Sequence, residues 1–250
     1  MDIKGIMLEQ LARDYACSIV DITSRRNVFV EARKLSNSRY FAEDTSFLRV
    51  LCINSKLVFF ADPVLYSWVR ERFDGFPGQW FFNIQTLKEV DNILNRYGYQ
   101  IHPFSHHNYI PGDHFASSDN TEEPVDFRIK WVEKADIPGL REENRFWNSF
   151  CFNSDVPDML GAIAEKDGTY IGAAGVRASS ENLWEMGVDV LETAQGKGVA
   201  TTLVRVLKDE LLQRGKVPYY GTAESHIKSQ KVAVKAGFVP AWAEVYTRKI

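Results

Sequence analysis

The residues with the clearest chemistry lie between a predicted strand and a predicted helix. Residues 188–200 read VDVLETAQGKGVA, and an amphipathic helical pattern follows at once. Glycines at such a junction let the backbone turn tightly, so that several N–H groups converge at the beginning of the helix. Gln195 adds a side-chain donor, and Lys197 adds a positive charge. The segment therefore predicts an anion site, and a ligand that carries a pyrophosphate in particular.

Two common nucleotide-binding loops do not fit this segment. The P-loop needs G-x-x-x-x-G-K followed by Ser or Thr, whereas Lys197 is followed by Gly198, and no glycine stands five residues before Gly196. The dinucleotide fingerprint G-x-G-x-x-G fails as well, because its sixth position is Thr201. Both nucleotide interpretations are excluded on spacing.

The spacing Gln195-x-x-Gly198-x-Ala200 resembles a different signature, Q/R-x-x-G-x-G/A. The GNAT (Gcn-five-related N-acetyltransferase) superfamily uses that signature to bind the pyrophosphate of acetyl-coenzyme A. Residues 229–238, SQKVAVKAGF, are similar to the closing helix of the superfamily and its terminal Gly-Phe. The order of predicted elements over residues 127–250 matches too, and is most similar to a bacterial stand-alone branch with an extra N-terminal α/β region.

The resemblance implies a fold and a set of binding residues. The fold is α/β, with a mixed, mostly antiparallel sheet flanked by helices in the C-terminal part. A strand over residues 185–190 would splay from its neighbour, so that its backbone pairs with the pantetheine arm of the cofactor. The implied cofactor-binding residues are Val188, Val190, Gln195, Gly196, Lys197, Gly198, Val199, Ala200, His226 and Ser229. The expected co-substrate is acetyl-CoA, and no metal is expected.

Acyl transfer needs a base for the amine and a donor for the departing thiolate. Glu185 lies where many superfamily members have the base, and we predict that role for it; an ion-pair partner or a solvated strand residue is the alternative. Many relatives have a tyrosine where this chain has Ala233, and an asparagine where it has His226. His226 is able to donate a hydrogen bond or a proton, but the thiol acid stays unassigned.

These residues together favour an N-acetyltransferase that moves an acetyl group from acetyl-CoA to a primary amine by direct attack in a ternary complex. The alternative is a non-catalytic sensor or interaction module that binds acyl-CoA, since the superfamily tyrosine is missing. As partners we expect a small-molecule or peptide amine, no nucleic acid and no membrane, and we allow for a homodimer.

Periodicity predicts the elements that position these residues. Helices are expected over residues 6–16, from 63, over 86–97, 137–146, 199–214 and 227–236, and strands over 47–53, 57–61, 127–131, 160–164, 169–176, 183–190 and 219–222. Residues 103–124 are rich in Ser, Asp, Asn, Gly and Pro and are expected to be a linker. The sequence thus predicts two domains. Residues 1–125 form an α/β domain that covers the substrate, and a degenerate copy of the GNAT domain is one option for it. Residues 126–250 form the acetyltransferase domain.

The composition fits this interpretation. The chain has 250 residues, of which 25% are charged, and its net charge is −3, so a dedicated nucleic-acid binder is disfavoured. The first twenty residues carry several charges and lack the apolar stretch of a signal peptide. Three well-separated cysteines, Cys17, Cys52 and Cys151, fit a reducing cytoplasm. We assign Cys151 no nucleophilic role, because no base is near it in the sequence.

Overall fold

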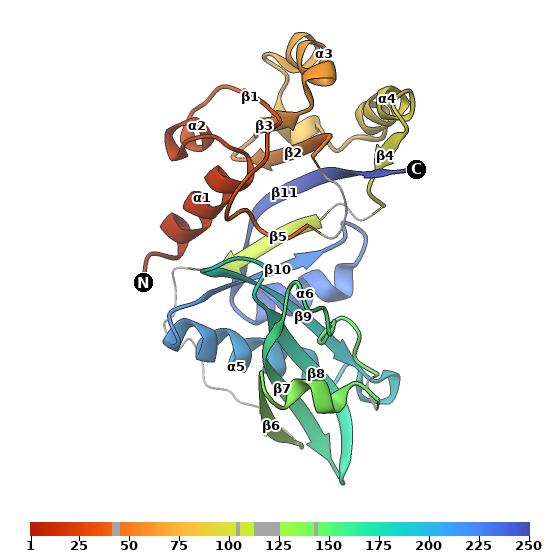
Figure 1. The fold of residues 1–250 in the computed structure, drawn as a ribbon. Coiled ribbons are helices and arrows are strands. Elements are labelled where there is room, and N and C mark those ends of the chain that lie inside the picture. The colour runs from red at the N-terminus through yellow and green to blue at the C-terminus, as the bar shows by residue number, and fades with distance from the viewer. Residues whose placement is uncertain (42–45, 104–105, 113–125, 143–144) are drawn as a thin grey trace. The chain divides into compact units, whose positions relative to one another are not determined.

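The computed structural model describes residues 1–41, 46–103, 106–112, 126–142 and 145–250, and Figure 1 shows its helices and strands. The helices are α1 (Ile3–Asp14), α2 (Ile19–Thr23), α3 (Pro63–Phe73), α4 (Ile84–Asn95), α5 (Val199–Gln213) and α6 (Ile227–Lys235), with short 3-10 helices η1 (Gly78–Trp80), η2 (Ile137–Leu140) and η3 (Glu192–Ala194). The strands are β1 (Val28–Glu31), β2 (Leu48–Ile53), β3 (Lys56–Ala61), β4 (Tyr99–Ile101), β5 (His106–Pro111), β6 (Arg128–Glu133), β7 (Asp158–Lys166), β8 (Thr169–Arg177), β9 (Leu183–Val190), β10 (Val217–Thr222) and β11 (Phe238–Lys249).

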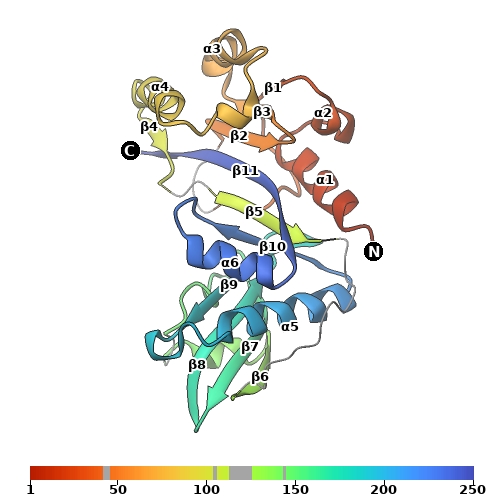
Figure 2. The same ribbon diagram turned by 180° about the vertical axis from the view of Figure 1, so that it is seen from behind.

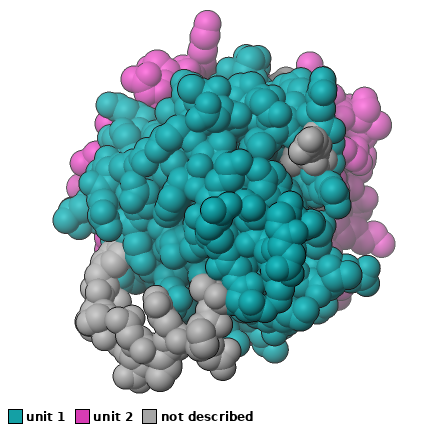
Figure 3. All heavy atoms as spheres, turned by 90° about the horizontal axis from the view of Figure 1, so that it is seen from below, with its two compact units in different colours: residues 1–3, 109–240 teal, residues 4–108, 241–250 magenta. Residues whose placement is uncertain are grey.

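The chain divides into two compact units, which Figure 3 colours separately. Unit 1 comprises residues 1–3 and 109–240, and unit 2 comprises residues 4–108 and 241–250. The chain therefore passes between the units at the start of α1, within β5 and within β11. The division into domains over residues 1–125 and 126–250 stays a prediction.

The sheet of unit 1 is mixed and mostly antiparallel. Its strands follow the order β10-β9-β8-β7-β6, in which β6 to β9 are antiparallel and β9 and β10 are parallel. The turn between β7 and β8 has two residues in the left-handed region, Asp167 at φ 51° and Gly168 at φ 74°. That conformation matches the twist of a two-residue hairpin and explains the Asp-Gly signal in the sequence. The predicted fold class is confirmed.

One face of this sheet packs against two helices. Figure 2 shows α5 and α6 in front of it. Leu160, Val176 and Met186 point from the sheet into a buried cluster that also contains Leu203 and Leu207 of α5. Burying side chains of this size stabilises the fold by about 1.5–3 kcal/mol each. This packing fixes the direction of α5, and with it the position where the helix begins.

The opposite face of the sheet is covered by residues 146–152, which we call the strap. Gly175 and Gly187 face each other in register on β8 and β9. A Cβ atom on Gly187 would lie 1.8 Å from the backbone oxygen of Asn148, and one on Gly175 would lie 2.1 Å from that of Ser149. Only glycine admits so close an approach of two backbones. These two glycines therefore let the strap lie directly on the sheet.

Two aspartates hold the strap through its backbone N–H groups. Asp189 accepts hydrogen bonds from the backbone N–H groups of residues 148 and 149 at 2.8 and 2.9 Å. Asp158 accepts them from residues 151 and 152 at 3.3 and 2.8 Å. Charged acceptors make such bonds about twice as strong as neutral ones. The strap is thus a fixed part of unit 1.

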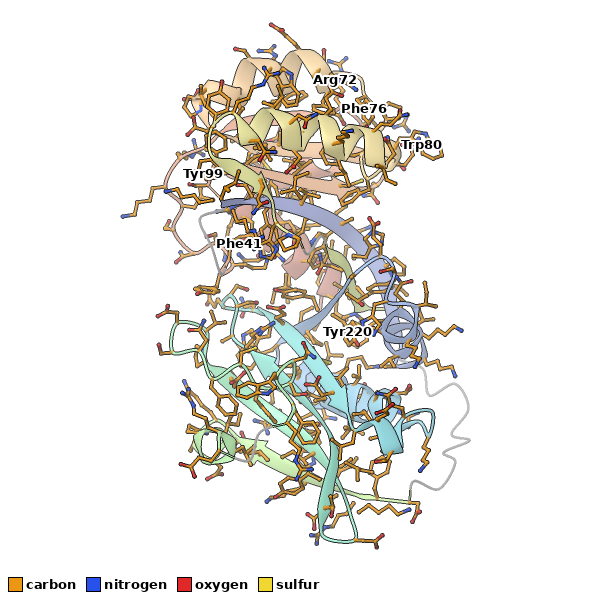
Figure 4. All side chains as sticks on the ribbon, turned by 90° about the vertical axis from the view of Figure 1, so that its right-hand side faces the viewer. Phe41, Arg72, Phe76, Trp80, Tyr99 and Tyr220 are labelled. Atoms are coloured by element: carbon orange, nitrogen blue, oxygen red, sulfur yellow. The ribbon has the colours of Figure 1, made fainter. Side chains whose placement is uncertain are left out.

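Unit 2 has its own group of paired strands and an aromatic core. β1 runs parallel to β3, β3 is antiparallel to β2, and residues 243–246 of β11 pair antiparallel with β2. Pro63 begins α3 after the N-cap Asp62, in agreement with the sequence. The rings of Phe59 and Phe73 stack 5.0 Å apart between these strands and α3. At the surface the Arg72 guanidinium lies over aromatic rings that include Phe76, labelled in Figure 4.

A network of charged side chains is buried in unit 2. The Nε atom of Arg39 lies 2.5 Å from Oδ2 of Asp14, and its Nη2 atom lies 2.8 Å from Oε2 of Glu244. The exposed fractions of the three side chains are 2%, 0% and 6%. Burial and the nearby charge of Glu244 raise the pKa of Tyr15 well above its usual value. Arg39 therefore compensates two carboxylates that have no access to bulk water.

Two predictions about secondary structure were wrong. Residues 106–111 of the expected linker form β5, whereas residues 113–125 lie outside the described residues. The expected helix over residues 137–146 is reduced to η2. Pro138 and Gly139 are poor helix formers, and the chain has to leave the helical path to enter the strap.

Candidate functional site

The predicted pyrophosphate loop connects β9 to α5. Gly196 and Gly198 both adopt left-handed backbone conformations, with φ of 76° and 77°. Gly198 is the N-cap of α5, and no side chain forms a capping hydrogen bond there among the described residues. A Cβ atom on either glycine would find no described atom within 4 Å. The loop therefore leaves open space in front of the first turn of α5.

The first turn of α5 presents backbone N–H groups that the helix itself cannot satisfy. The first bond within the helix runs from the N–H of Thr202 to the carbonyl of Gly198, at 3.0 Å. Val199 is buried against the core, and Ala200 is half-buried. The helix dipole adds about half a positive charge at this end. The turn thus offers fixed donors and positive potential to an anion.

The two polar side chains of the loop bind its own backbone. Gln195 Nε2 donates to the carbonyl of Val190 at 3.5 Å, and Lys197 Nζ donates to that of Thr193 at 3.0 Å. Both residues are exposed. They flank Gly196, and both side chains are accessible to a ligand.

The backbone of β9 points alternately to its two neighbours. The N–H of Leu191 donates to the carbonyl of Ile171 at 2.9 Å, which continues the register that pairs Val190 with Gly172 of β8. In an antiparallel pair, alternate residues direct both backbone groups to the same partner. Odd-numbered residues of β9 therefore face β8, and Val188 and Val190 direct their N–H and C=O groups toward β10.

β10 does not follow β9 along this second edge. The two strands are in register from Leu183 and Val217 to Met186 and Tyr220. Both strands continue, β9 to Val190 and β10 to Thr222, but no pair in register joins those parts among the described residues. The carbonyl of Val190 accepts the weak hydrogen bond from Gln195. The other backbone groups of Val188 and Val190 form a short open edge, which an extended ligand is able to pair with as an added strand would.

Glu185 is held in an ion pair. Arg177 lies directly opposite it on β8, and its Nη2 and Nε atoms bind the two carboxylate oxygens at 2.7 and 2.9 Å. The exposed fractions of the two side chains are 26% for Arg177 and 28% for Glu185. Burial disfavours the charged guanidinium, but Glu185 outweighs this effect and raises the pKa of Arg177. Glu185 therefore lies on the strand where the base was predicted, and it is also an ion-pair partner, which was the alternative.

Cys151 of the strap completes this cluster. Its sulfur accepts a short hydrogen bond from Nη1 of Arg177. Burial raises the pKa of the Cys151 thiol, although the charge of Arg177 acts in the opposite direction. The thiol is therefore the dominant form at neutral pH, and a thiol is a poor nucleophile. Its contact with Arg177 ties the end of the strap to the Glu185 ion pair.

The residues predicted at the thioester end lie on α6 and in the turn before it. His226 is the N-cap of α6 and is exposed, with no side-chain capping bond among the described residues. Ser229 is half-buried, and its hydroxyl lies 2.9 Å from the hydroxyl of Tyr220 on β10, which Figure 4 labels. Burial raises the pKa of Tyr220, and the hydrogen bond to Ser229 opposes this change. Ala233 is fully buried in the same core cluster as Tyr220.

The parallel pairing of β9 and β10 brings these parts to one edge of the sheet. α5 and α6 begin after the carboxyl ends of these strands. Arg177 was missed in the sequence analysis, and so was the fact that Asp189 of β9 binds the strap. A signal for Arg177 existed, because opposite charges flank the polar turn over residues 178–182 and a hairpin pairs such residues across the sheet. The strap had no comparable signal.

Residues 125–238 match a family model described as the acetyltransferase (GNAT) family. Solved structures that this chain matches include a GCN5-related N-acetyltransferase-like protein of Streptococcus suis, with 14% identity, coverage of 97% of this chain and 99% of that chain, and a TM-score of 0.49. They also include a GNAT-family acetyltransferase of Colwellia psychrerythraea, with 14% identity, 84% coverage of each chain and a TM-score of 0.44. The yncA protein of Salmonella typhimurium, solved with acetyl-CoA, has 19% identity, covers 50% of this chain and 94% of that chain, and gives a TM-score of 0.36. No curated protein matched the chain.

The family match covers the strands of unit 1 that form the open edge, the glycine loop and α6. This matched part of the chain is that of an acetyltransferase. Residues 125–238 form a domain of the GNAT family, as the sequence resemblance predicted. Among the helices of the described residues, none has the length and hydrophobicity needed to cross a bilayer. The described residues also contain no cluster of His, Cys, Asp or Glu side chains suited to a metal ion.

Proposed function

We propose that this protein transfers an acetyl group from acetyl-CoA to a primary amine, by direct attack in a ternary complex in the cytoplasm. The observation that carries the proposal is the combination of an open β9 edge with a glycine loop at the beginning of α5. Coenzyme A contains a pyrophosphate and an arm with amide groups. The glycine loop is suited to the pyrophosphate, and the β9 edge is suited to the arm. The match of residues 125–238 to the acetyltransferase family supports the choice of an acetyl group.

The binding residues follow from these two features. Gly196, Gly198, Val199 and Ala200 would hold the pyrophosphate through backbone N–H groups, with Gln195 and Lys197 turned toward it. The N–H and C=O groups of Val188 and Val190 would pair with amides of the arm. His226 and Ser229 would border its reactive end. When bound, the thioester supplies an activated acyl carbon and a thiolate leaving group.

The amine has to reach the reactive end from the strap side of the sheet. The α5 side is a packed apolar core, whereas Glu185 and Arg177 on the strap side are part-exposed. Glu185 would take the proton from the amine, directly or through a water molecule. Arg177 would keep the carboxylate ionised, and would thereby act as a positioning residue. The acceptor would be a small-molecule or peptide amine.

The experiment that tests this function has two parts. Calorimetry on the purified full chain is expected to show binding of coenzyme A and acetyl-CoA, with Kd values below the millimolar range. Release of free thiol from acetyl-CoA is then followed over a panel of primary amines. Undetectable binding at millimolar coenzyme would overturn the proposed function, and so would binding without turnover on any amine.

Replacing Glu185 with glutamine is expected to lower kcat about 100-fold, because a positioned general base contributes about 10²–10⁴-fold. The KM for acetyl-CoA should stay near its wild-type value, since Glu185 does not line the predicted coenzyme site. Steady-state kinetics with the best amine of the panel provides the measurement.

Arg177→Met is the matched variant, because it breaks the same ion pair and keeps the carboxylate. It should retain more activity than Glu185→Gln. The acidic limb of its pH–rate profile should move to higher pH, because the carboxylate loses the positive charge that favours its ionised form. Equal losses in both variants, without this movement, would indicate a purely structural ion pair.

A non-catalytic sensor of acyl-CoA is the second candidate. Two observations favour it: Ala233 has no hydroxyl for the departing thiolate, and both oxygens of Glu185 are bound by Arg177. Tight coenzyme binding, no turnover with any amine and an unchanged background rate in Glu185→Gln would select the sensor.

A further inference from the structure

Thr222 has a buried hydroxyl without a hydrogen-bond partner among the described residues. The residue is 4% exposed, and its Oγ1 atom makes no hydrogen bond with any described group of the protein. Leaving a buried hydroxyl unpaired costs about 1–3 kcal/mol. Native structures contain few such groups, and each needs an explanation. A threonine at this position is disadvantageous for folding unless something else binds its hydroxyl.

The position of Thr222 indicates what that partner is. Thr222 is the last residue of β10 and lies two residues beyond Tyr220, where the pairing with β9 ends. Continuing the register of Tyr220 with Met186 sets Thr222 at the level of Val188. The backbone N–H and C=O groups of Val188 face this side of β9. The backbone groups of Val188 on β9 and the hydroxyl of Thr222 on β10 thus lie at the same level, where the two strands diverge.

The neighbouring hydroxyl on β10 gives a useful contrast. Side chains two apart on a strand share a face, so Tyr220 and Thr222 point to the same side of the sheet. Tyr220 has a partner, the hydroxyl of Ser229 on α6 at 2.9 Å. α6 therefore supplies a hydrogen-bond partner for the hydroxyl of Tyr220, where β9 and β10 are still paired. No described residue does so for the hydroxyl of Thr222, where the strands diverge.

We propose that the Thr222 hydroxyl is a binding contact for the amide-bearing arm of coenzyme A, at the level of Val188. This inference rests on the proposed function and adds a residue on β10 to a site otherwise built from β9 and the glycine loop. The arm has two amides, and a hydroxyl is able to donate to a carbonyl or accept from an N–H. The contact is one of binding, and no bond is made or broken.

Thr222→Val is the sharpest test, because valine keeps the shape and removes only the hydroxyl. Calorimetry is run with coenzyme A and with adenosine 3′,5′-bisphosphate, which lacks the arm. We expect the Kd for coenzyme A to rise about 3- to 10-fold, the range of one hydrogen bond, and the Kd for the bisphosphate to stay unchanged. The unfolding temperature of the free variant should equal or exceed that of the wild type, because an unpaired hydroxyl has been removed.

Thr169→Val is the matched control, since Thr169 is exposed at the start of β8. It should bind both ligands as the wild type does. An unchanged Kd for coenzyme A in Thr222→Val would overturn this inference and leave the proposed function standing. Equal weakening of both ligands would overturn it too, because the effect would then not be specific to the arm. Failure of the wild type to bind coenzyme A would overturn the proposed function first.

Discussion

Replacing Gly198 with alanine is expected to weaken coenzyme A binding at least 100-fold, close to complete loss in a calorimetric titration. The new Cβ atom would project into the open space before α5, where the pyrophosphate is proposed to lie. Anion sites at helix beginnings depend on close approach of the ligand to the backbone, and a methyl group prevents that approach. The positive φ of this residue adds strain of about 1–2 kcal/mol to the folded state.

Gly215→Ala separates these two effects. Gly215 follows α5 and has a φ of 75°, and a Cβ atom added to it would meet no described atom within 4 Å, so its backbone strain matches that of Gly198. Both variants should lose similar stability in urea unfolding, whereas only Gly198→Ala should lose the coenzyme. Wild-type affinity in Gly198→Ala would refute the assignment of the loop, and equal affinity losses in both variants would attribute the effect to strain.

Arg39→Met is expected to lower the free energy of unfolding by about 3–5 kcal/mol, the usual cost of removing one partner from a buried ion pair. Methionine fills a similar volume, so the loss comes from Asp14 and Glu244, which remain buried and lose the cation that binds them both. Since folded proteins are stable by only about 5–15 kcal/mol, this single change approaches the stability of the whole chain. Urea unfolding followed by circular dichroism provides the measurement.

Arg72→Met is the control for this experiment. Arg72 also pairs with a carboxylate in unit 2, Glu89, at 2.7 Å, but the exposed fractions of the two side chains are 36% and 38%. An exposed pair contributes about 0–1 kcal/mol, so this variant should remain near the wild type. Adding Glu244→Gln to Arg39→Met should restore part of the lost stability. Equal losses in the two arginine variants would show that burial of the network is unimportant.

Local signals predicted the fold where they were strong. The Lys-Asp-Gly turn, the strand over residues 183–190 and the helix that begins at Val199 are confirmed, because turn chemistry and periodicity act over a few residues. The helix expected over residues 86–97 begins earlier, at Ile84. Asn83 rather than Thr86 is its N-cap, and its side chain accepts from the N–H of Thr86 at 2.9 Å. Both residues are good caps, so local propensity does not choose between them.

Features that depend on pairing between distant segments could not be predicted from the sequence. β5 has a composition typical of a loop, and its pairing with distant strands makes it a strand. For the site, the glycine spacing was sufficient to predict the loop at α5. The ion pair of Arg177 and the unpaired hydroxyl of Thr222 depend on the register between strands and on where that register ends. A one-residue slip would reverse every side chain, and one sequence does not exclude such a slip.

The path of β11 has a consequence for how the protein is made. Its residues 241–250 belong to unit 2, where they pair with β2 and β4 and supply the buried Glu244 and Thr247. All of unit 1 beyond residue 108 is therefore translated between the two parts of unit 2. The first part of unit 2 is synthesised before residues 109–240 of unit 1, and its last ten residues are synthesised after them. Until residues 241–250 are made, unit 2 lacks the strand that pairs with β2, and its buried charge network lacks Glu244.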